Sequence, residues 1–286
     1  MGIDVLVVGS VNEDVVASVE RLPGPGETLL ASDLALSCGG KGANQAVAAA
    51  RGGVRVAMAG AVGDDEAGRR QAEALDAAGV DIRWLRRLAG VPTGTAFIQV
   101  DARGENTIVV VQGANARVAL PGGDVEARVV VTQNEIPPAA QQAAGELAAR
   151  SGARLVINAA PAPGSPPPWY GNADPLVVNE HEAAQLAASN EAGAGLLRRL
   201  RERTGARSVV MTLGERGALV DDGTGVHAIP PVVVEQVVDA TGAGDTFVGV
   251  LAARLARGEG LVAAASAANR FAAEAVTWSG ARPPAG

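Results

Sequence analysis

The sequence predicts an α/β fold in which a mostly parallel central sheet is flanked by helices, with a small second β-sheet beside it. Short valine-rich runs alternate with alanine-rich segments of helical length. Because these runs are apolar at nearly every position, both faces of their sheet must be covered, as in βαβ units. Two stretches, residues 15–32 and 94–115, have strand character but no helix after them. They predict a small antiparallel sheet outside the main one.

The elements of the main sheet are marked by glycine and proline at their ends. Strands are expected over residues 4–10, 54–60, 127–135, 154–160, 175–180 and 208–214. Helices are expected over residues 42–53, 65–80, 137–152 and 181–190, and two more begin at 242 and 260. Glycine ends the first two helices, and proline occupies the first turn of the third. In the second sheet, the turn "DARGEN" predicts a hairpin.

Composition bounds the class of protein. The 286 residues suit one large domain or two modest ones, and the aromatic share of 2% requires a core of alanine, valine and leucine. A net charge of −7 argues against a nucleic-acid partner, which needs a basic face. The single cysteine, Cys38, excludes an internal disulfide. With no signal segment and no apolar run of membrane length, we expect a cytoplasmic protein without a membrane partner.

The stretch "DATGAGDTF" (239–247) combines an anion site with a carboxylate. Gly242 and Gly244 allow a sharp turn that leaves backbone N–H groups bare at the start of a predicted helix. Such a helix N-terminus attracts anions. Asp245 in the first helical turn is a good capping residue, yet it would repel a bound anion. Either Asp245 is only a cap, or the anion and the carboxylate meet through a reaction.

Three further polar groups follow predicted strands. They are Asp14, the glycine-rich motif "CGGKGANQAVAAA" (38–50) with Lys41 and Asn44, and Asn179 with Glu182. Each has an ordinary structural explanation in isolation: a turn residue, a flexible loop, and a capping-box variant. Because ligands bind beyond the carboxyl ends of parallel strands, we expect all of them to converge on one edge of the sheet.

Three motifs in this order, "GGKGANQAVAAA", "NEHEA" and "DATGAGDTF", closely resemble the ribokinase-like (PfkB) family of carbohydrate kinases. The resemblance covers nearly the whole chain. It implies a single ribokinase-like kinase domain over residues 1–286, with lid segments inserted at about 15–32 and 94–111. It also implies a homodimer formed through the β lid. The implied activity is ATP-dependent transfer of phosphate to the 5-hydroxyl of D-ribose, giving D-ribose 5-phosphate and ADP.

The resemblance also assigns roles to individual residues. Asp245 becomes the catalytic base, and the turn of residues 242–245, with Gly242, Ala243 and Gly244, becomes the anion hole for the γ-phosphate. The implied ribose-binding set is Asp14, Gly40, Lys41, Asn44, Glu135 and Asp245. The implied ATP-binding set is Asn179, Thr212, Gly214, Gly217, Gly244 and Asn269. For metals, the resemblance implies Mg²⁺ near Glu182 through water, and K⁺ or another monovalent cation at Asp239, Thr241, Ala275 and Gly280. The sequence departs from the family pattern at Trp278 and Pro284, where a small or basic residue and a serine are expected.

Three alternatives stay open. Within the same family, a 2-deoxyribose kinase differs by a single substrate hydroxyl, and a nucleoside kinase needs aromatic contacts that are scarce here. A sugar- or nucleotide-sensing protein without catalysis is an alternative of another class. The presence of Asp245 argues against it, because a pure binder needs no base. A sensor would saturate with ribose and release no ADP.

Overall fold

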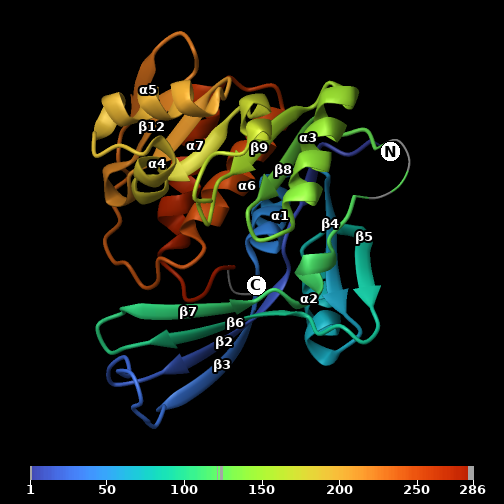
Figure 1. The fold of residues 1–286 in the computed structure, drawn as a ribbon, viewed down its shortest axis with the longest axis vertical. Helices are drawn as coiled ribbons and strands as arrows, with labels where there is room; N and C mark the ends of the chain where they lie inside the picture. Colours follow the sequence, from blue (N-terminus) through green and yellow to red (C-terminus); the bar gives the residue numbers. More distant parts are fainter. Residues whose placement is uncertain (1, 121, 123–124, 283–286) are drawn as a thin grey trace.

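The computed structural model describes residues 2–120, 122 and 125–282. It contains a large sheet of nine strands and a separate sheet of four (Figure 1). The large sheet has the order β13-β12-β11-β10-β9-β8-β1-β4-β5. Its strands are β1 Val5–Val8, β4 Val56–Gly63, β5 Asp81–Leu88, β8 Val129–Gln133, β9 Arg154–Asn158, β10 Leu176–Asn179, β11 Val209–Thr212, β12 Ala218–Asp221 and β13 Val226–Ile229. The predicted fold class is confirmed.

The order of this sheet reverses at β1. The chain runs from β1 outward through β4 to β5, and then returns to place β8 on the other side of β1. From there it runs outward through β9, β10 and β11, all parallel, while β12 and β13 add an antiparallel edge. A reversal of this kind opens a crevice at the carboxyl ends of the two central strands. The carboxyl ends of β1 and β8 are therefore the expected place for a ligand.

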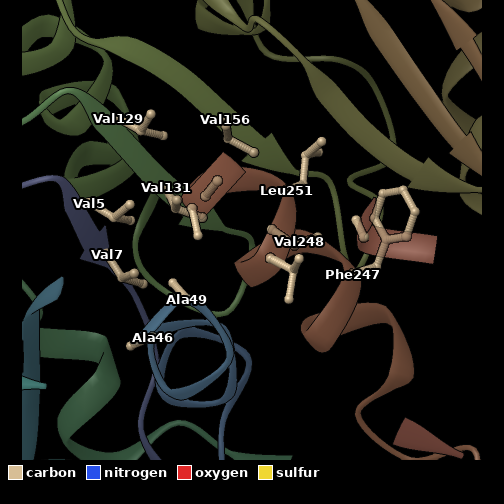
Figure 2. Close-up of a cluster of buried hydrophobic side chains, with 14 of the residues drawn as sticks. Val5, Val7, Ala46, Ala49, Val129, Val131, Val156, Phe247, Val248 and Leu251 are labelled. Atoms are coloured by element: carbon tan, nitrogen blue, oxygen red, sulfur yellow. The ribbon is translucent and has the colours of Figure 1, made fainter. Parts of the chain in front are cut away.

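Helices cover both faces of the sheet, as the apolar strands require. On one face lie α1 Lys41–Arg51, α2 Glu66–Ala77, α6 Ala243–Ala256 and α7 Leu261–Ala275; on the other lie α3 Pro138–Ser151, α4 Glu180–Ala187 and α5 Gly193–Thr204. Val5 and Val7 of β1 pack into the first core, where Figure 2 shows them facing Ala46 and Ala49 of α1. Leu6 and Val8 pack into the second core. Alternate residues of one strand thus join the two cores.

The smaller sheet, which we call the lid sheet, has the order β3-β2-β6-β7, with β2 Asn12–Ser18, β3 Asp33–Gly39, β6 Gly94–Val100 and β7 Asn106–Val111. The predicted hairpin of β6 and β7 is confirmed. The sheet is not wholly antiparallel as predicted, because β2 and β6 run parallel. The predicted bounds 15–32 are wrong, because β2 starts at Asn12 and its partner β3 comes only after residue 32. Leu30 belongs to the apolar stretch that predicted a strand here, but its side chain is 94% exposed in the connection between β2 and β3.

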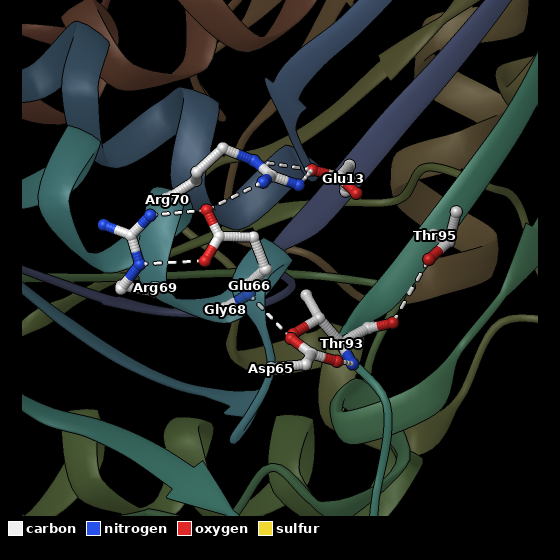
Figure 3. A network of polar contacts seen from close by, with 8 residues as sticks. All are labelled: Glu13, Asp65, Glu66, Gly68, Arg69, Arg70, Thr93 and Thr95. Carbon is white, nitrogen blue, oxygen red and sulfur yellow. Dashed lines mark hydrogen bonds and ion pairs between the residues drawn. The ribbon is translucent and has the colours of Figure 1, made fainter.

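The lid sheet is attached to helix α2 by polar contacts (Figure 3). Asp65 caps the helix by accepting from the Gly68 N–H at 2.8 Å, and its other oxygen accepts from the Thr93 N–H at 2.8 Å. Thr93 immediately precedes β6. Arg70 of the same helix pairs with Glu13 of β2. Two strands of the lid sheet are therefore tied to one helix of the main body.

The other predicted strands and helices are confirmed within a few residues, but several elements were not predicted. Helix α5, strand β5 and the hairpin of β12 and β13 are the main ones. Strand β5 carries three arginines and an aspartate because it forms the sheet edge, so its pattern is not that of a buried strand. Within the part of the chain that the structure describes, every helix is too short or too polar to cross a bilayer.

Candidate active site

Two polar side chains meet at the reversal of the main sheet. Ser10 follows β1 and Glu135 follows β8, and the Ser10 hydroxyl donates to Glu135 Oε2 at 2.6 Å. The same carboxylate oxygen accepts from the Lys41 backbone N–H at 3.1 Å, at the first residue of α1. Gly40 is the residue just before this helix. The start of α1 is therefore fastened to the carboxyl ends of both central strands.

A pocket of about 130 Å³ opens beside these residues. Its lining consists of Lys41, Asn158, Ala160, Val177, Val178, Asn179, Glu182, Thr212, Gly242, Gly244, Asp245 and Val248. Most of these residues were predicted as site residues from the sequence. A larger hollow of about 510 Å³ lies between residues 232–238 and the end of α7, but none of the predicted residues lines it. We therefore assign the active site to the smaller pocket.

Asp245 is held at the centre of the site by two amide side chains. It lies in the first turn of α6 and is 8% exposed. Its Oδ2 accepts from Asn44 Nδ2 at 3.1 Å, and its Oδ1 accepts from Gln45 Nε2 at 3.0 Å. Gln45 is itself fixed, because it also donates to Asn158 Oδ1 at 3.0 Å and accepts from Gln133 Nε2 at 2.8 Å. The orientation of the carboxylate is thus set by a buried network.

The network depends on the close packing of α1 against α6. A Cβ added at Gly249 of α6 would lie 2.4 Å from the Gln45 carbonyl oxygen and 2.6 Å from Ala48 Cβ. Only glycine permits this approach, which brings Asn44 and Gln45 of one helix to Asp245 of the other. Gln45, Gln133 and Asn158 were not predicted as site residues. The small residues around Gly249 are the one sequence signal of this packing.

The sharp turn predicted before α6 is formed by a glycine in the left-handed conformation. Gly242 has φ +78°, and its Cα faces Ala281, so a side chain there would meet Ala281 Cα at 2.6 Å. The prediction that the Ala243 N–H is bare needs correction, because it donates to the Ala240 carbonyl at 3.3 Å as the turn folds back. Among the described residues, the N–H groups of Gly244 and Asp245 have no hydrogen-bond acceptor. The open donors at Gly244 and Asp245 therefore lie within the predicted turn, and the Ala243 N–H is the one that departs from the prediction.

Charged side chains surround Asp245 on the side of the lid sheet. Burial, together with the Glu135 charge, raises the pKa of Asp14 to about 7, although the Arg282 charge opposes the rise. The Asp245 charge raises the pKa of Lys41 above its ordinary value, against the effect of burial. Lys41 and Arg282 are therefore the cations of this carboxylate cluster, and Asp14 titrates near neutral pH.

Asn179 and Glu182 form the capping box that the sequence suggested. The Asn179 side chain accepts from the Glu182 N–H at 2.8 Å, and the Glu182 carboxylate accepts from the Asn179 N–H at 2.8 Å. Both residues also line the pocket. Burial raises the pKa of Glu182. One oxygen of Glu182 is used by the cap, so the pair has a structural role and still faces the site.

The remaining predicted nucleotide residues lie at the edge of the pocket or beyond it. Thr212 ends β11 and lines the pocket, whereas Gly214 and Gly217 form the turn that follows it. The Leu213 N–H donates to the Gly217 carbonyl at 2.8 Å and closes this turn. Asn269 of α7 is 9% exposed and donates to the Pro230 carbonyl at 3.0 Å. Gly214, Gly217 and Asn269 do not line the pocket itself.

The predicted monovalent-cation residues form a connected loop. Asp239 accepts from the Thr241 N–H at 2.8 Å and from the Gly280 N–H at 2.8 Å, and Ala275 is the last residue of α7. Although burial raises the pKa of Asp239, these hydrogen bonds bring it below its usual value. The Arg51 guanidinium lies over the ring of Trp278, 5.3 Å from the ring centroid. Pro284 lies outside the described residues. Among the residues that the structure describes, no group of three acidic, histidine or cysteine side chains is placed to hold a metal ion.

Comparison with known proteins identifies the family. Residues 3–285 match the pfkB family of carbohydrate kinases. The chain belongs to this family. A ribokinase of Mus musculus is 37% identical, over 88% of this chain and 81% of that protein. A ribokinase of Bacillus subtilis is 36% identical, over 98% of this chain and 94% of that protein. The structure of Arabidopsis thaliana ribokinase complexed with ribose and ATP has a TM-score of 0.88 at 29% identity, covering 98% of this chain and 95% of that one.

Membership of the pfkB family gives the pocket its chemical context. In a carbohydrate kinase, one pocket must hold a hydroxyl group, a phosphate and a base within reach of one another. Asp245 and the open N–H groups at the start of α6 meet that requirement over two consecutive residues. The carboxylates and Lys41 on the lid side are suited to sugar hydroxyls.

Proposed function

We propose that this chain is an ATP-dependent kinase that transfers the γ-phosphoryl group to the 5-hydroxyl of D-ribose. The products are D-ribose 5-phosphate and ADP. The ribokinases to which it is similar carry the name of this activity, and they are aligned over most of their length. The observation that supports the reaction most directly is the position of Asp245, which is buried, fixed by two amides and adjacent to open N–H donors.

Asp245 takes the proton from the 5-hydroxyl as that oxygen attacks the γ-phosphorus. The new bond joins the ribose oxygen to phosphorus, the bond to the β–γ bridging oxygen breaks, and ADP leaves. Asn44 and Gln45 donate to the two carboxylate oxygens and hold them toward the attacking oxygen. A base placed in this way contributes roughly 10²- to 10⁴-fold to the rate. Positioning supplies much of the rest in phosphoryl transfer.

The N–H groups of Gly244 and Asp245 stabilise the charge on the transferred group. They belong to the first turn of α6, where helix N–H groups lack internal partners and the helix dipole favours an anion. Magnesium bound with ATP neutralises phosphate charge in such reactions. Glu182 suits an outer contact through water, because it faces the pocket with one oxygen outside its capping bond.

The loop at Asp239 is suited to hold K⁺ or another monovalent cation. Asp239 joins Thr241 to Gly280, so the start of the anion-binding turn and the segment after α7 move as one unit. A cation bound by this unit steadies the turn of Gly242 from behind. Rate measurements in K⁺, Na⁺ and choline chloride at equal ionic strength test this role. Equal rates in all three salts argue against it.

The exposed face of the lid sheet is suited to pair with a second copy of the chain. Leu34, Leu36, Phe97 and Val109 lie on one face by strand register, and each is about half exposed or more. A contiguous apolar face of this kind on a small sheet marks an interface. Phe97→Asp is expected to convert a dimer to a monomer in sedimentation velocity. A wild type that sediments as a monomer at micromolar concentration contradicts the proposal.

The experiment that tests the activity is ADP release with D-ribose, ATP and Mg²⁺ for the wild type and Asp245→Asn. We expect the wild type to turn over ribose, and the variant to lose more than about 10²-fold in kcat with an unchanged melting temperature. Asp76→Asn, at an exposed carboxylate on α2, is the matched control. Turnover of 2-deoxyribose or a nucleoside in preference to ribose points to the alternative kinases. Sugar-induced stabilisation without ADP from any acceptor points to a sensor.

A further inference from the structure

The segment that follows α7 returns to the active site. The Gly280 N–H binds Asp239, and Ala281 packs against Gly242 in the turn that starts α6. This path carries the next residue, Arg282, past Asp245 and into the acceptor side of the site. No role was predicted for Arg282, which lies two residues after Gly280 of the predicted cation loop.

Arg282 contacts three elements of the acceptor side. Its Nε donates to Asn44 Oδ1 at 2.9 Å, and its Nη2 donates to the Gly39 carbonyl at 3.2 Å and faces Gln71 Oε1 at 3.5 Å. These partners belong to α1, to the end of β3 in the lid sheet, and to α2. The guanidinium thus joins both helices to the lid sheet at the site of the acceptor.

The contact with Asn44 fixes which way its amide group points. With Oδ1 accepting from Arg282, Nδ2 must face Asp245, to which it donates at 3.1 Å. A reversed amide would place N–H against the guanidinium and oxygen against the carboxylate. Both contacts would then be repulsive. Arg282 therefore determines, through Asn44, how the Asp245 carboxylate is held.

The other end of the guanidinium points to a ligand. Arg282 Nη1 is buried and has no hydrogen-bond partner among the described residues. An unpaired buried donor on a charged group is costly, so a group that accepts from it gains binding free energy. The charges nearest to Arg282 include Asp14 and Asp245. They disfavour an anionic acceptor, and a neutral sugar hydroxyl oxygen is the suitable partner.

We infer that Arg282 is a positioning residue of the acceptor site, which orients Asn44 toward Asp245 and offers Nη1 to a hydroxyl of the sugar. This inference rests on the proposed function, since it takes the surroundings of Asn44 and Asp245 on the lid side as the acceptor site. It adds a residue from the chain's end to a site otherwise built from β2, α1, α6 and the loop after β8.

The test compares Arg282→Gln, Arg282→Lys and Arg282→Ala with Arg199→Gln, an exposed arginine of α5, as the matched control. The measurements are kcat, the KM for ribose and the KM for ATP, with the melting temperature of each variant. Losing a hydrogen bond to a charged group lowers kcat/KM for ribose about 10- to 100-fold in Arg282→Gln and Arg282→Ala. The KM for ATP stays within about twofold of the wild type. Millimolar guanidinium is expected to restore part of the activity of Arg282→Ala but none in Arg282→Lys.

Two results would overturn the inference. One is an unchanged or higher kcat/KM for ribose in Arg282→Ala, which would mean that the side chain only fills the empty site. The other is a loss shared equally by ribose and ATP, without guanidinium rescue and with a lower melting temperature, which indicates a structural role.

A second readout separates this inference from the proposed function. The rise in melting temperature with added ribose is measured for the wild type and Arg282→Gln. If the wild type makes no ADP from ribose, the proposed activity fails. A ribose-induced rise that is lost only in Arg282→Gln then still supports the role of Arg282, and an equal rise in both proteins rejects it.

Discussion

The two halves of the candidate active site are built in different ways. The acceptor half consists of side chains that bind one another: Asp14, Asn44 and Asp245 are each less than 10% exposed, and amides and cations join them across the fold. The nucleotide half consists of the capping box of Asn179 and Glu182, Thr212 with the glycine turn after it, and the loop after β13, where Val233 is 92% exposed.

This difference reflects what each half must recognise. A sugar hydroxyl needs a positioned base and fixed acceptors, and these require buried, mutually bonded side chains. A nucleotide offers phosphates that backbone N–H groups bind, together with a base that fits between loops. Changes in the acceptor half should therefore alter the chemistry strongly, whereas changes in the nucleotide half should mainly alter ATP affinity.

Gly249→Ala should have the largest effect, because it separates the two helices that build the acceptor half. The new methyl would meet backbone atoms of α1 at less than 3 Å, so the helices must move apart. We expect kcat to fall about 10²-fold as Asn44 and Gln45 leave Asp245, and stability to fall by roughly 1–3 kcal/mol. Steady-state kinetics and urea unfolding measure the two effects.

Gly145→Ala in α3 is the matched control for this prediction. Its new methyl would lie no closer than 3.4 Å to the Leu155 side chain, so the helix has room for it. Alanine is also the better helix former, and we expect stability to be unchanged or slightly higher. If both variants keep full activity, the spacing of α1 and α6 does not control the orientation of Asp245.

The sequence predicts one side of this helix contact and misses the other. Asp245, the glycine turn and the strand ends follow from local patterns and from the edge of a parallel sheet. Gln45 does not, since a glutamine in an alanine-rich helix reads as an exposed residue. Its partner Asp245 is 200 residues away, and only the packing of α1 on α6 buries the pair. The same holds for Arg282, whose contacts depend on the path of the chain after α7.

Asp14→Asn should weaken ribose binding and stabilise the protein at alkaline pH. The pKa of Asp14 is about 7 in the folded state and 3.8 as its ordinary value, so the folded state binds more protons between these limits. Stability therefore falls as pH rises from about 4 to 7, and removing the charge restores up to about 4 kcal/mol above pH 7. The KM for ribose should rise about 10- to 100-fold.

Urea unfolding at pH 5 and pH 8 checks the stability part of this prediction. The gain of Asp14→Asn over the wild type should be larger at pH 8 than at pH 5. An equal gain at both pH values would show that the carboxylate does not titrate in this range. Glu20→Gln, at an exposed residue just after β2, serves as the control for a lost surface charge.

Glu182→Gln separates the two roles of the capping box in the nucleotide half. Glutamine at this position still binds the Asn179 N–H, so the free energy of unfolding should change by less than about 0.5 kcal/mol. Removing the carboxylate should raise the Mg²⁺ concentration for half-maximal rate by about 10-fold. Asn179→Ala should have the complementary effect on stability: loss of the cap should lower the free energy of unfolding by about 1 kcal/mol. An unchanged Mg²⁺ dependence in Glu182→Gln would mean that Glu182 acts only in the capping box.

Asn269→Ala should have the smallest effect and the one most specific to the nucleotide half. Its side chain holds the loop after β13 through the Pro230 carbonyl, with a bond of about 1 kcal/mol. The higher helix propensity of alanine offsets part of that loss in stability. The loosened loop should raise the KM for ATP about 3- to 10-fold, with the KM for ribose unchanged.

Ser266→Ala, one turn earlier on α7, is the control. If the KM for ribose rises as much as that for ATP, the two halves are mechanically coupled through α7 and α6, and the division between them does not hold.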